Sequence, residues 1–273
     1  MRFCSLSSSS YANSVVIQDK NTCILVDCGL RKRDIKPYLR AAGLSPGDID
    51  AVLLTHCHVD HVYGLGYLLE ENDVPVHSTA GVASQLAGSF FFKKTPRFDI
   101  LKTSVEKKIG TLSVVPFKLS HDVETVGFIV SDGSERLGFL TDTGIVPGYC
   151  IRAFKSVDYI YIESNHDVEM YRHSSKPVHV IKRNLGPNGH LSNEQCAQAL
   201  RSMGLDSCKL VVLAHLSEDD NKPERALACA RRLLPPGLLL KSAPSRVPGV
   251  WSDIYIKNSQ KGRFNKQMRL RPI

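Results

Sequence analysis

The sequence lacks the features that mark a membrane protein or a secreted disulfide scaffold. No apolar run approaches the roughly 18 residues that a membrane-spanning helix needs, so we expect no membrane span. The N-terminal segment MRFCSLSSSS has no apolar core of signal-peptide length. The eight cysteines form no C-x-x-C pair, which disfavours a thiolate zinc site and a thioredoxin-like redox centre. We therefore expect a cytoplasmic protein with reduced thiols.

Acidic residues are missing from one region of the chain. Residues 257–273 contain no aspartate or glutamate, and their six basic residues account for most of the net charge of +8. These basic residues are Lys257, Lys261, Arg263, Lys266, Arg269 and Arg271. Such a tail is typical of a protein with a polyanionic partner, although a solvated tail without a partner fits equally well. We expect one globular domain over residues 1–256 and a basic tail over 257–273 that is mobile until it meets a polyanion.

The remaining chain has an ordinary globular composition, with 42% hydrophobic and 23% charged residues. Its strand-like segments are 14–18, 22–27, 51–55, the period-two region 111–141, 158–164, 209–215 and 251–256. Its clearest helical segments are 34–42, 192–203 and 223–234, the second with Ser192 as cap and Gln195 three residues later. Most strands end in His, Asp or Glu. This pattern predicts an α/β domain with its site at the strand ends.

A dense group of metal-binding residue types follows one of these buried strands. His56, His58, Asp60 and His61 occupy six consecutive positions. An extended segment can turn His56 and His58 toward one point, whereas Asp60 and His61 begin the next helix and can face a second point. One ion cannot easily take four ligands from so short a piece, so the spacing favours two adjacent metal ions.

Three later residues stand at the ends of other strands. His121 ends FKLSH, Asp142 ends RLGFLTD and His215 ends KLVVLAH. Each alone is more often structural than functional. Together they supply a third imidazole for one ion, a carboxylate to bridge both ions, and a third ligand for the other. Asp27 ends a strand of its own and fits the same scheme.

The motif T-H-x-H-x-D-H at 55–61, followed by His121, TDTG at 141–144 and His215, resembles the ordered signature of the metallo-β-lactamase superfamily. Within that superfamily the chain is most similar to the YycJ/WalJ group of bacterial single-domain exonucleases. The segments that carry the closer match are 3–8, 13–14, 54–65, 119–122, 141–144, 163–170, 189–197 and 213–226.

The resemblance implies an α/β fold of the metallo-β-lactamase type, an αβ/βα four-layer sandwich with two metal ions at one edge, and makes residues 1–256 the catalytic domain. It implies a first ion held by His56, His58 and His121. It implies a second ion held by Asp60, His61 and His215. Asp142 would bridge the two ions, and Asp27 would support the ligands from behind. A His/Asp site without thiolate accepts zinc, manganese or iron; the resemblance favours manganese, with zinc next.

Two further features favour phosphodiester hydrolysis among the many chemistries of this fold. Glu163 and His190 look like the Glu–His pair of the RNA-processing nucleases in the superfamily. A histidine held by a carboxylate is suited to protonating a leaving oxygen, although His190 alone is also explained as a residue at a helix start. The segment 168–189 is basic, and we expect it to lie over the metal edge where a phosphate backbone would pass. A solvated surface loop is the alternative.

The basic residues of that segment are Arg172, Lys176, Lys182 and Arg183. Nearby Asn165 and His166 have groups to hydrogen-bond a phosphate or a carboxylate behind the ligands, and purely structural roles are as plausible. The run Phe90–Lys94 interleaves aromatic rings with charge, which fits either stacking on an unpaired base or core packing.

The predicted function is that of a metal-dependent phosphodiesterase, a DNA exonuclease acting from the 5′ end. DNA as substrate and the 5′ polarity are implied by the resemblance alone. In the predicted mechanism, a hydroxide activated by two divalent ions attacks phosphorus, Asp60 orients it or takes its proton, and His190 protonates the departing oxygen. The alternatives are a small-molecule phosphodiesterase or an RNA-processing nuclease of the same fold, and more remotely a non-catalytic nucleic-acid-binding module.

Overall fold

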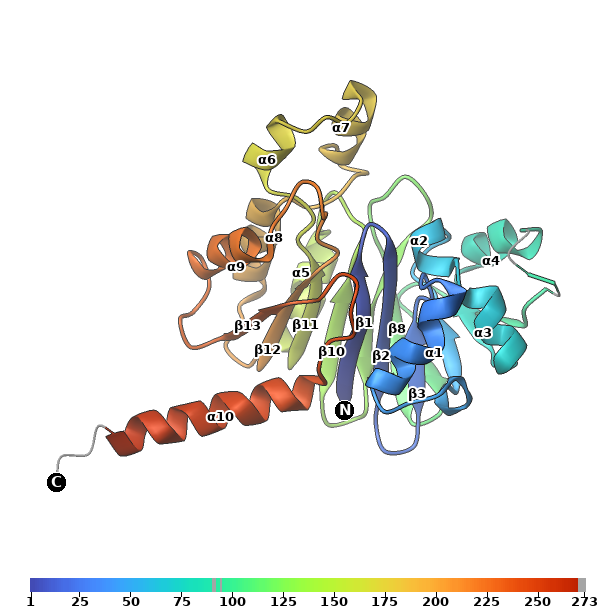
Figure 1. The fold of residues 1–273 in the computed structure, drawn as a ribbon, viewed down its shortest axis with the longest axis horizontal. Helices are drawn as coiled ribbons and strands as arrows, with labels where there is room; N and C mark the ends of the chain where they lie inside the picture. Colours follow the sequence, from blue (N-terminus) through green and yellow to red (C-terminus); the bar gives the residue numbers. More distant parts are fainter. Residues whose placement is uncertain (90–91, 94, 270–273) are drawn as a thin grey trace.

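The structure is a computed structural model that describes residues 1–89, 92–93 and 95–269, with side chains as far as Lys261 at the C-terminal end. Two β-sheets pack face to face, and helices cover both outer faces (Figure 1). The first sheet has the order β1 (Arg2–Ser9), β2 (Ala12–Gln18), β3 (Cys23–Val26), β4 (Ala51–Leu53), β5 (Val76–Ser78) and β6 (Phe98–Ile100). This layering confirms the predicted α/β sandwich.

In the second sheet, the strands lie side by side in the reverse of their order along the chain. It consists of β13 (Leu239–Ser242), β12 (Leu210–Ala214), β11 (Tyr159–Glu163), β10 (Arg136–Leu140), β9 (Val126–Ser131), β8 (Leu112–Lys118) and β7 (Lys107–Ile109). The core between the sheets combines alternate side chains of both, such as Ile17 and Val26 from the first and Phe128 and Tyr161 from the second. Burial of such apolar surface is the main source of stability for this layer.

The outer helices bury apolar faces against the sheets. The first sheet is covered on its outer side by helices that include α1 (Lys32–Ala41), α2 (Val59–Val62), α3 (Leu65–Glu71) and α4 (Ala80–Ala87). The second sheet is covered by α5 (Gly148–Ala153), α8 (Asn193–Met203) and α9 (Pro223–Arg231). Two short helices, α6 (Val168–Arg172) and α7 (Val178–Asn184), project beyond the end of the second sheet (Figure 1).

The parallel strands explain why the predicted site residues meet. Strands β3 to β6 run parallel to one another, as do β10 to β13. The carboxyl ends of these strands therefore lie at one edge of each sheet. Asp27 follows β3, Asp142 comes two residues after β10, and His215 follows β12. Side chains that are far apart in the sequence thus share one edge of the sandwich.

The prediction of a strand over 251–256 is wrong, because this segment belongs to the helix α10 (Ser252–Arg269). Trp251 directly precedes the helix, and Tyr255 lies in its first turn. The indole of Trp251 donates a hydrogen bond to the carbonyl oxygen of Ala42 at 3.0 Å, and Tyr255 packs against the core between the sheets. Alternation over six residues suggested a strand, but these two aromatic contacts favour the helix.

The expected boundary between residues 256 and 257 falls inside α10, so the basic tail continues a helix as far as Arg269. That the tail is mobile until it meets a polyanion stays a prediction. The division into a domain and a tail stays a prediction. Arg271 lies outside the described residues, as do Phe90, Phe91 and Lys94.

Phe92 is partly buried against the outer core of the first sheet, as expected if the Phe90–Lys94 run contributes to packing. All eight cysteines are free. Among the described residues, none of the helices combines the length and the apolar character needed to cross a bilayer.

Candidate metal centre

Three imidazoles form the first candidate ligand set at the sandwich edge. His56 lies in the loop after β4, His58 precedes α2, and His121 follows β8. One nitrogen of each ring lies within 4.8 Å of the corresponding nitrogens of the other two, and His121 Nε2 is 3.4 Å from His58 Nδ1. Three converging imidazole nitrogens are a common ligand set for one divalent transition-metal ion.

A second candidate set lies beside the first, and Asp142 is placed between them. The ligand atoms of Asp60, His61 and His215 lie within 4.8 Å of one another, and so do those of His56, His61 and Asp142. Asp142 Oδ2 is 3.3 Å from His61 Nε2, and Asp142 Oδ1 is 3.5 Å from His215 Nε2. The structure therefore brings together all seven residues predicted as ligands.

The polar atoms of this cluster fit a site for cations. Within the described part of the chain, the buried atoms His56 Nε2, Asp142 Oδ2 and His215 Nε2 have no hydrogen-bond partner. A buried polar atom without a partner costs about 1–3 kcal/mol, so such atoms are rare unless a ligand satisfies them. His56 belongs to the first set, His215 belongs to the second, and Asp142 lies between them, whereas other such atoms, for example His77 Nδ1, lie elsewhere. Imidazole nitrogen and carboxylate oxygen are donors that divalent metal ions accept.

The residues behind the ligands fix how the imidazoles face. Asp27 Oδ2 lies 2.7 Å from His61 Nδ1, so the proton of that ring is held at Nδ1 and Nε2 faces the site. The backbone and hydroxyl of Thr55 both donate to the Asp27 carboxylate, at 2.9 Å and 2.8 Å. This geometry agrees with the role of supporting the ligands that the resemblance implies for Asp27.

Three residues of the site adopt left-handed backbone conformations. Asp27, Asp142 and His215 have φ angles of 56°, 60° and 52°. Residues other than glycine seldom adopt this conformation, and it costs free energy unless the surrounding structure compensates for it. Each of the three stands directly beyond a parallel strand. The sharp turn there directs the side chain into the edge between the two sheets.

The two ligand sets differ in their electrostatics. Burial lowers the pKa of His56 well below its usual value, and the neighbouring His61 adds to the effect. Burial also opposes charge on His215, but the surrounding carboxylates, led by Asp142, raise its pKa to about 10. Burial would raise the pKa of Asp60, yet His61 and other partners hold it well below its usual value. The second set is thus richer in negative charge.

The predicted contact between Glu163 and His190 is present. Glu163 Oε1 lies 2.8 Å from His190 Nδ1. The same oxygen lies 2.8 Å from His215 Nδ1, a contact that was not predicted. The other oxygen accepts hydrogen bonds from the backbone N–H groups of Thr143 and Leu191 at 3.1 Å and 3.0 Å. Glu163 therefore orients a candidate ligand and the candidate proton donor at once.

Sequence reasoning missed three residues that contact this cluster. Asn13 Nδ2 lies 3.1 Å from Asp60 Oδ2 and 3.0 Å from His61 Nε2. Asp122 Oδ1 lies 3.3 Å from the Nε2 atoms of both His58 and His121. Ser8 Oγ accepts a hydrogen bond from the backbone N–H of His215 at 2.8 Å. Asp122 is next to a predicted ligand, and this adjacency was the available signal.

Asn165 and His166 lie behind the cluster and not on its open side, since they are only 3% and 1% exposed. Asn165 Nδ2 donates to the carbonyl oxygen of His215 at 3.0 Å. Burial lowers the pKa of His166 to about 4, and its ring packs against Tyr171 at 4.7 Å between centroids. Their burial favours the supporting role over direct contact with a phosphate.

The basic segment 168–189 borders the first ligand set. His121 Nδ1 donates to the carbonyl oxygen of Gly189 at 3.1 Å, and Arg183 lies 3.5 Å from the Asp122 carboxylate. These contacts put the segment beside the first ligand set, and its expected position over the metal edge stays a prediction. Its predicted contacts with a phosphate backbone stay predictions.

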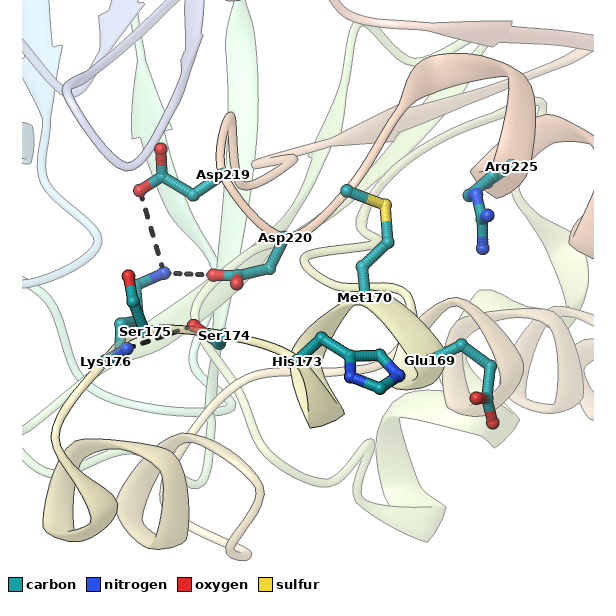
Figure 2. Close-up of a pocket in the computed structure, with 9 residues that line it drawn as sticks. All are labelled: Glu169, Met170, His173, Ser174, Ser175, Lys176, Asp219, Asp220 and Arg225. Atoms are coloured by element: carbon teal, nitrogen blue, oxygen red, sulfur yellow. Dashed lines mark hydrogen bonds and ion pairs between the residues drawn. The ribbon is translucent and has the colours of Figure 1, made fainter.

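Several charges in this segment are already paired within the protein. Figure 2 shows the pocket of about 560 Å³ between the segment and the loop after β12, where Lys176 meets Asp219 at 3.9 Å and also contacts the buried Asp220. Arg172 pairs with Glu169 at 2.6 Å. These pairings lower the charge that Lys176 and Arg172 offer to a phosphate, whereas Lys182 is exposed.

Comparisons with known proteins agree with this geometry. A sequence profile of the family described as "Beta-lactamase superfamily domain" matches residues 22–216. Exodeoxyribonuclease YycJ of Bacillus anthracis is 32% identical over 238 residues, which cover 86% of this chain and 89% of that protein. Exodeoxyribonuclease WalJ of Streptococcus pneumoniae is 33% identical over 227 residues, which cover 81% of this chain and 83% of that protein.

A solved structure shows the same fold. The metallo-beta-lactamase fold protein YhfI from Bacillus subtilis superposes with a TM-score of 0.70 and 16% sequence identity, covering 91% of this chain and 98% of its own. The fold class and the resemblance inferred from the motifs are both confirmed. The chain therefore belongs to the beta-lactamase superfamily and, within it, to the family of the YycJ and WalJ exodeoxyribonucleases.

Proposed function

We propose that this chain, a metal-dependent nuclease, is a DNA exonuclease that removes nucleotides from the 5′ end. Its family membership supports hydrolysis of phosphodiester bonds, and the relatives named as exodeoxyribonucleases support DNA as the substrate. The observation that carries the proposal is the Glu163–His190 pair at 2.8 Å, beside a cluster of seven candidate ligands. This pair would add a proton donor to a site that binds a phosphate.

Divalent metal binding follows from the family and from the donor set. We propose two ions per chain, manganese or zinc, the first held by His56, His58 and His121. The second ion would be held by Asp60, His61 and His215, and Asp142 would bind both ions. Bound in this way, such ions supply charge stabilisation for the phosphate oxygens and lower the pKa of water.

The protein side chains orient the reacting groups. In this proposal Asp60 orients the attacking hydroxide or takes its proton. Its pKa lies well below the usual value, so it is ionised at neutral pH. Asn13 donates to Asp60 Oδ2 at 3.1 Å and thereby limits the orientation of that carboxylate. His190 has Nδ1 held by Glu163, so its Nε2 is the nitrogen that can donate a proton to the departing 3′-oxygen.

The decisive test is cleavage of DNA and RNA oligonucleotides carrying a label at either end, by purified protein with manganese or with zinc. We expect release of labelled mononucleotide from 5′-labelled DNA at the earliest times, and shortening from the 5′ end of 3′-labelled DNA. Faster cleavage of RNA would assign the chain to the RNA-processing alternative. Hydrolysis of bis-p-nitrophenyl phosphate without cleavage of either nucleic acid would assign it to small-molecule substrates.

A non-catalytic binding module is the remaining alternative. The complete set of seven ligand-type residues speaks against it, because such a module has no need of a polar cluster that leaves buried atoms unpaired. Binding of DNA without any cleavage, under every metal condition, would be the result that supports it.

A further inference from the structure

A pocket of about 700 Å³ opens beside the first candidate ligand set, at the loop that joins β8 to β9. We call it the β8–β9 pocket. His121 belongs both to the ligand set and to the lining of this pocket. The lining also includes Lys118, Ser120 and Glu124 from the same stretch of chain, and Asn188 from the end of the segment 168–189. The sequence motifs assigned this pocket no ligand.

The walls of the β8–β9 pocket are held by contacts within the protein. The backbone N–H of Gly144 donates to the carbonyl oxygen of Ser120 at 3.0 Å, and the hydroxyl of Ser120 donates to Asn188 Oδ1 at 3.0 Å. A Cβ atom at Gly144 would lie 2.3 Å from the carbonyl oxygen of Gly186, so these two loops are in direct contact. Pockets for small organic groups are usually preformed and measure about 300–1,000 Å³. The β8–β9 pocket has both properties.

The lining combines apolar surface with polar groups that are free to bind. Leu119 and Val126 line the pocket and are only 4% and 1% exposed. The hydroxyl of Ser120 occupies Asn188 Oδ1, and this leaves the Nδ2 group of the exposed Asn188 as a donor. A nucleic-acid base presents apolar faces and a hydrogen-bonding edge, and proteins bind it with this combination of groups.

The charges of the lining favour an uncharged group over a phosphate. Lys118 and Glu124 carry opposite charges, and within the described part of the chain neither has an ion-pair partner. The Glu124 carboxylate repels a phosphate, whereas metal ions held by the adjacent ligand sets attract one. The phosphate of a bound nucleotide should therefore lie at the ions, and its base and sugar in the pocket.

The position of His190 indicates which nucleoside enters the pocket. Asn188 is two residues before His190, and the ring centroids of His121 and His190 lie 5.1 Å apart. His190 is the proposed proton donor to the departing 3′-oxygen, so the sugar that carries this oxygen must lie beside it. In an enzyme that works from the 5′ end, that sugar belongs to the terminal nucleotide.

We propose that the β8–β9 pocket binds the base and sugar of the terminal nucleotide, the one that cleavage releases. The inference rests on the proposed nuclease function and deepens it, because it names the group that the site recognises. Asn188 donates a hydrogen bond to the bound nucleoside, and Leu119 and Val126 contact it through their apolar surface. A nucleoside 5′-monophosphate is therefore the small molecule that should fit this site.

The first test is calorimetric titration of the metal-loaded protein with deoxyadenosine 5′-monophosphate, and in parallel with inorganic phosphate. Both probes can reach the ions, but only the nucleotide can fill the pocket. The nucleotide should bind about tenfold or more tightly, since apolar contact and a hydrogen bond add to the contacts of the phosphate. Equal affinities of the two probes would overturn the inference.

The second test places the bound nucleotide with two variants. Val123→Trp fills the pocket, and Asn188→Ala removes the amide donor; the exposed Val105→Trp and Asn258→Ala are the matched controls. Asn188→Ala should weaken nucleotide binding about 2- to 12-fold, the range for one hydrogen bond between neutral groups. Val123→Trp should reduce the affinity for the nucleotide to that for phosphate.

Neither pocket variant should alter phosphate affinity, metal content or thermal unfolding, and the controls should bind the nucleotide like the wild type. If Val123→Trp lost metal, because it lies two residues from His121, Asn188→Ala would carry the test alone. Nucleotide binding by Asn188→Ala equal to that of the wild type would show that the amide makes no contact, and the inference would be overturned.

Failure of the inference and failure of the proposed function give different results. A wild type that binds the nucleotide through the pocket but cleaves neither DNA nor RNA would refute the nuclease function and leave the pocket as a nucleotide site. A wild type that cleaves DNA from the 5′ end but binds the nucleotide no more tightly than phosphate would do the reverse.

Discussion

His56, His61, His121 and His215 each have Nδ1 held by a neighbour, which directs Nε2 toward the site. The hydroxyl of Thr55 donates to Asp27 and can accept a hydrogen bond from His56 Nδ1 at 2.9 Å. The lone pair of His56 Nε2 is then free to bind a metal ion. His121 Nδ1 is held by a backbone carbonyl and His215 Nδ1 by Glu163. Fixing the tautomer in advance raises the affinity of an imidazole for metal, since no reorientation is needed.

Replacing Asp142 by alanine should abolish DNA cleavage and lower the bound metal below the wild-type amount. Asp142 lies 3.3 Å from His61 and 3.5 Å from His215 of the second set, and its ligand atom is within 4.8 Å of that of His56 in the first set. Its removal therefore takes negative charge from between two cations. Metal content is measured by elemental analysis, with the exposed Asp219→Ala as the matched control. Full activity with two metal ions per chain would refute the bridging role.

Replacing Asp27 by asparagine tests support of the ligands without changing their number. Asparagine tolerates the left-handed conformation at φ 56°, so the backbone should be kept, but the charged acceptor for His61 Nδ1 is lost. Metal affinity should fall about 10- to 100-fold. Titration of the metal-free variant with zinc and a competing chelator measures this, and an affinity equal to that of the wild type would show that the contact is not needed.

Replacing His190 by alanine should keep the metal content and lower the rate of DNA cleavage by roughly 10²–10⁴, the usual size of a general-acid contribution. The loss should be smaller for a p-nitrophenyl ester, because p-nitrophenolate leaves without a proton. An equal loss on both substrates would indicate that His190 binds substrate or supports the fold. Glu163→Gln is less specific, since Glu163 also contacts His215.

At the scale of elements, the start of α8 fixes the segment that carries His190. Ser192 Oγ accepts from the backbone N–H of Gln195 at 3.2 Å, and Gln195 Oε1 accepts from the backbone N–H of Ser192 at 2.8 Å. This capping box was predicted from the sequence and is confirmed. It begins only two residues after His190, so the cap anchors the backbone of the proposed proton donor.

Ser192→Ala should therefore lower the free energy of unfolding by about 1 kcal/mol, the usual contribution of a helix N-cap. Urea unfolding measures the change, and Ser202→Ala, near the exposed end of the same helix, is the matched control. A Ser192 variant as stable as that control would show that the cap contributes nothing measurable.

The sequence predicts those parts of the site that depend on strand ends and fails where distant loops meet. Asp142 and His215 could be found because each follows an apolar strand, and parallel strands bring such ends to one edge. Asn13 belongs to a β-hairpin whose contact with Asp60 requires the whole sheet to be in place. Likewise, only the fold reveals that Lys176 is paired with Asp220.

At the scale of the whole molecule, α10 extends away from the sandwich and carries the basic tail (Figure 1). Tyr255 and Ile256 pack against the core between the sheets, so the attachment of the helix lies before residue 257. A protein ending at residue 256 keeps these contacts. The tail can therefore be removed as a test of its role in binding, with the packed part of the helix retained.

Deletion of 257–273 should weaken DNA binding and leave metal content and p-nitrophenyl ester hydrolysis unchanged. If all six cations contact phosphates of a duplex, the slope of log K against log salt changes by about 5, or about a thousandfold in affinity between 50 and 200 mM salt. Some of the six side chains will contact no phosphate, so we expect roughly half of that slope. Binding of a short duplex by full-length and 1–256 protein, with calcium in place of the active metal, measures the difference. Identical slopes would mean that the tail does not hold DNA, and the segment 168–189 would then have to supply the contacts.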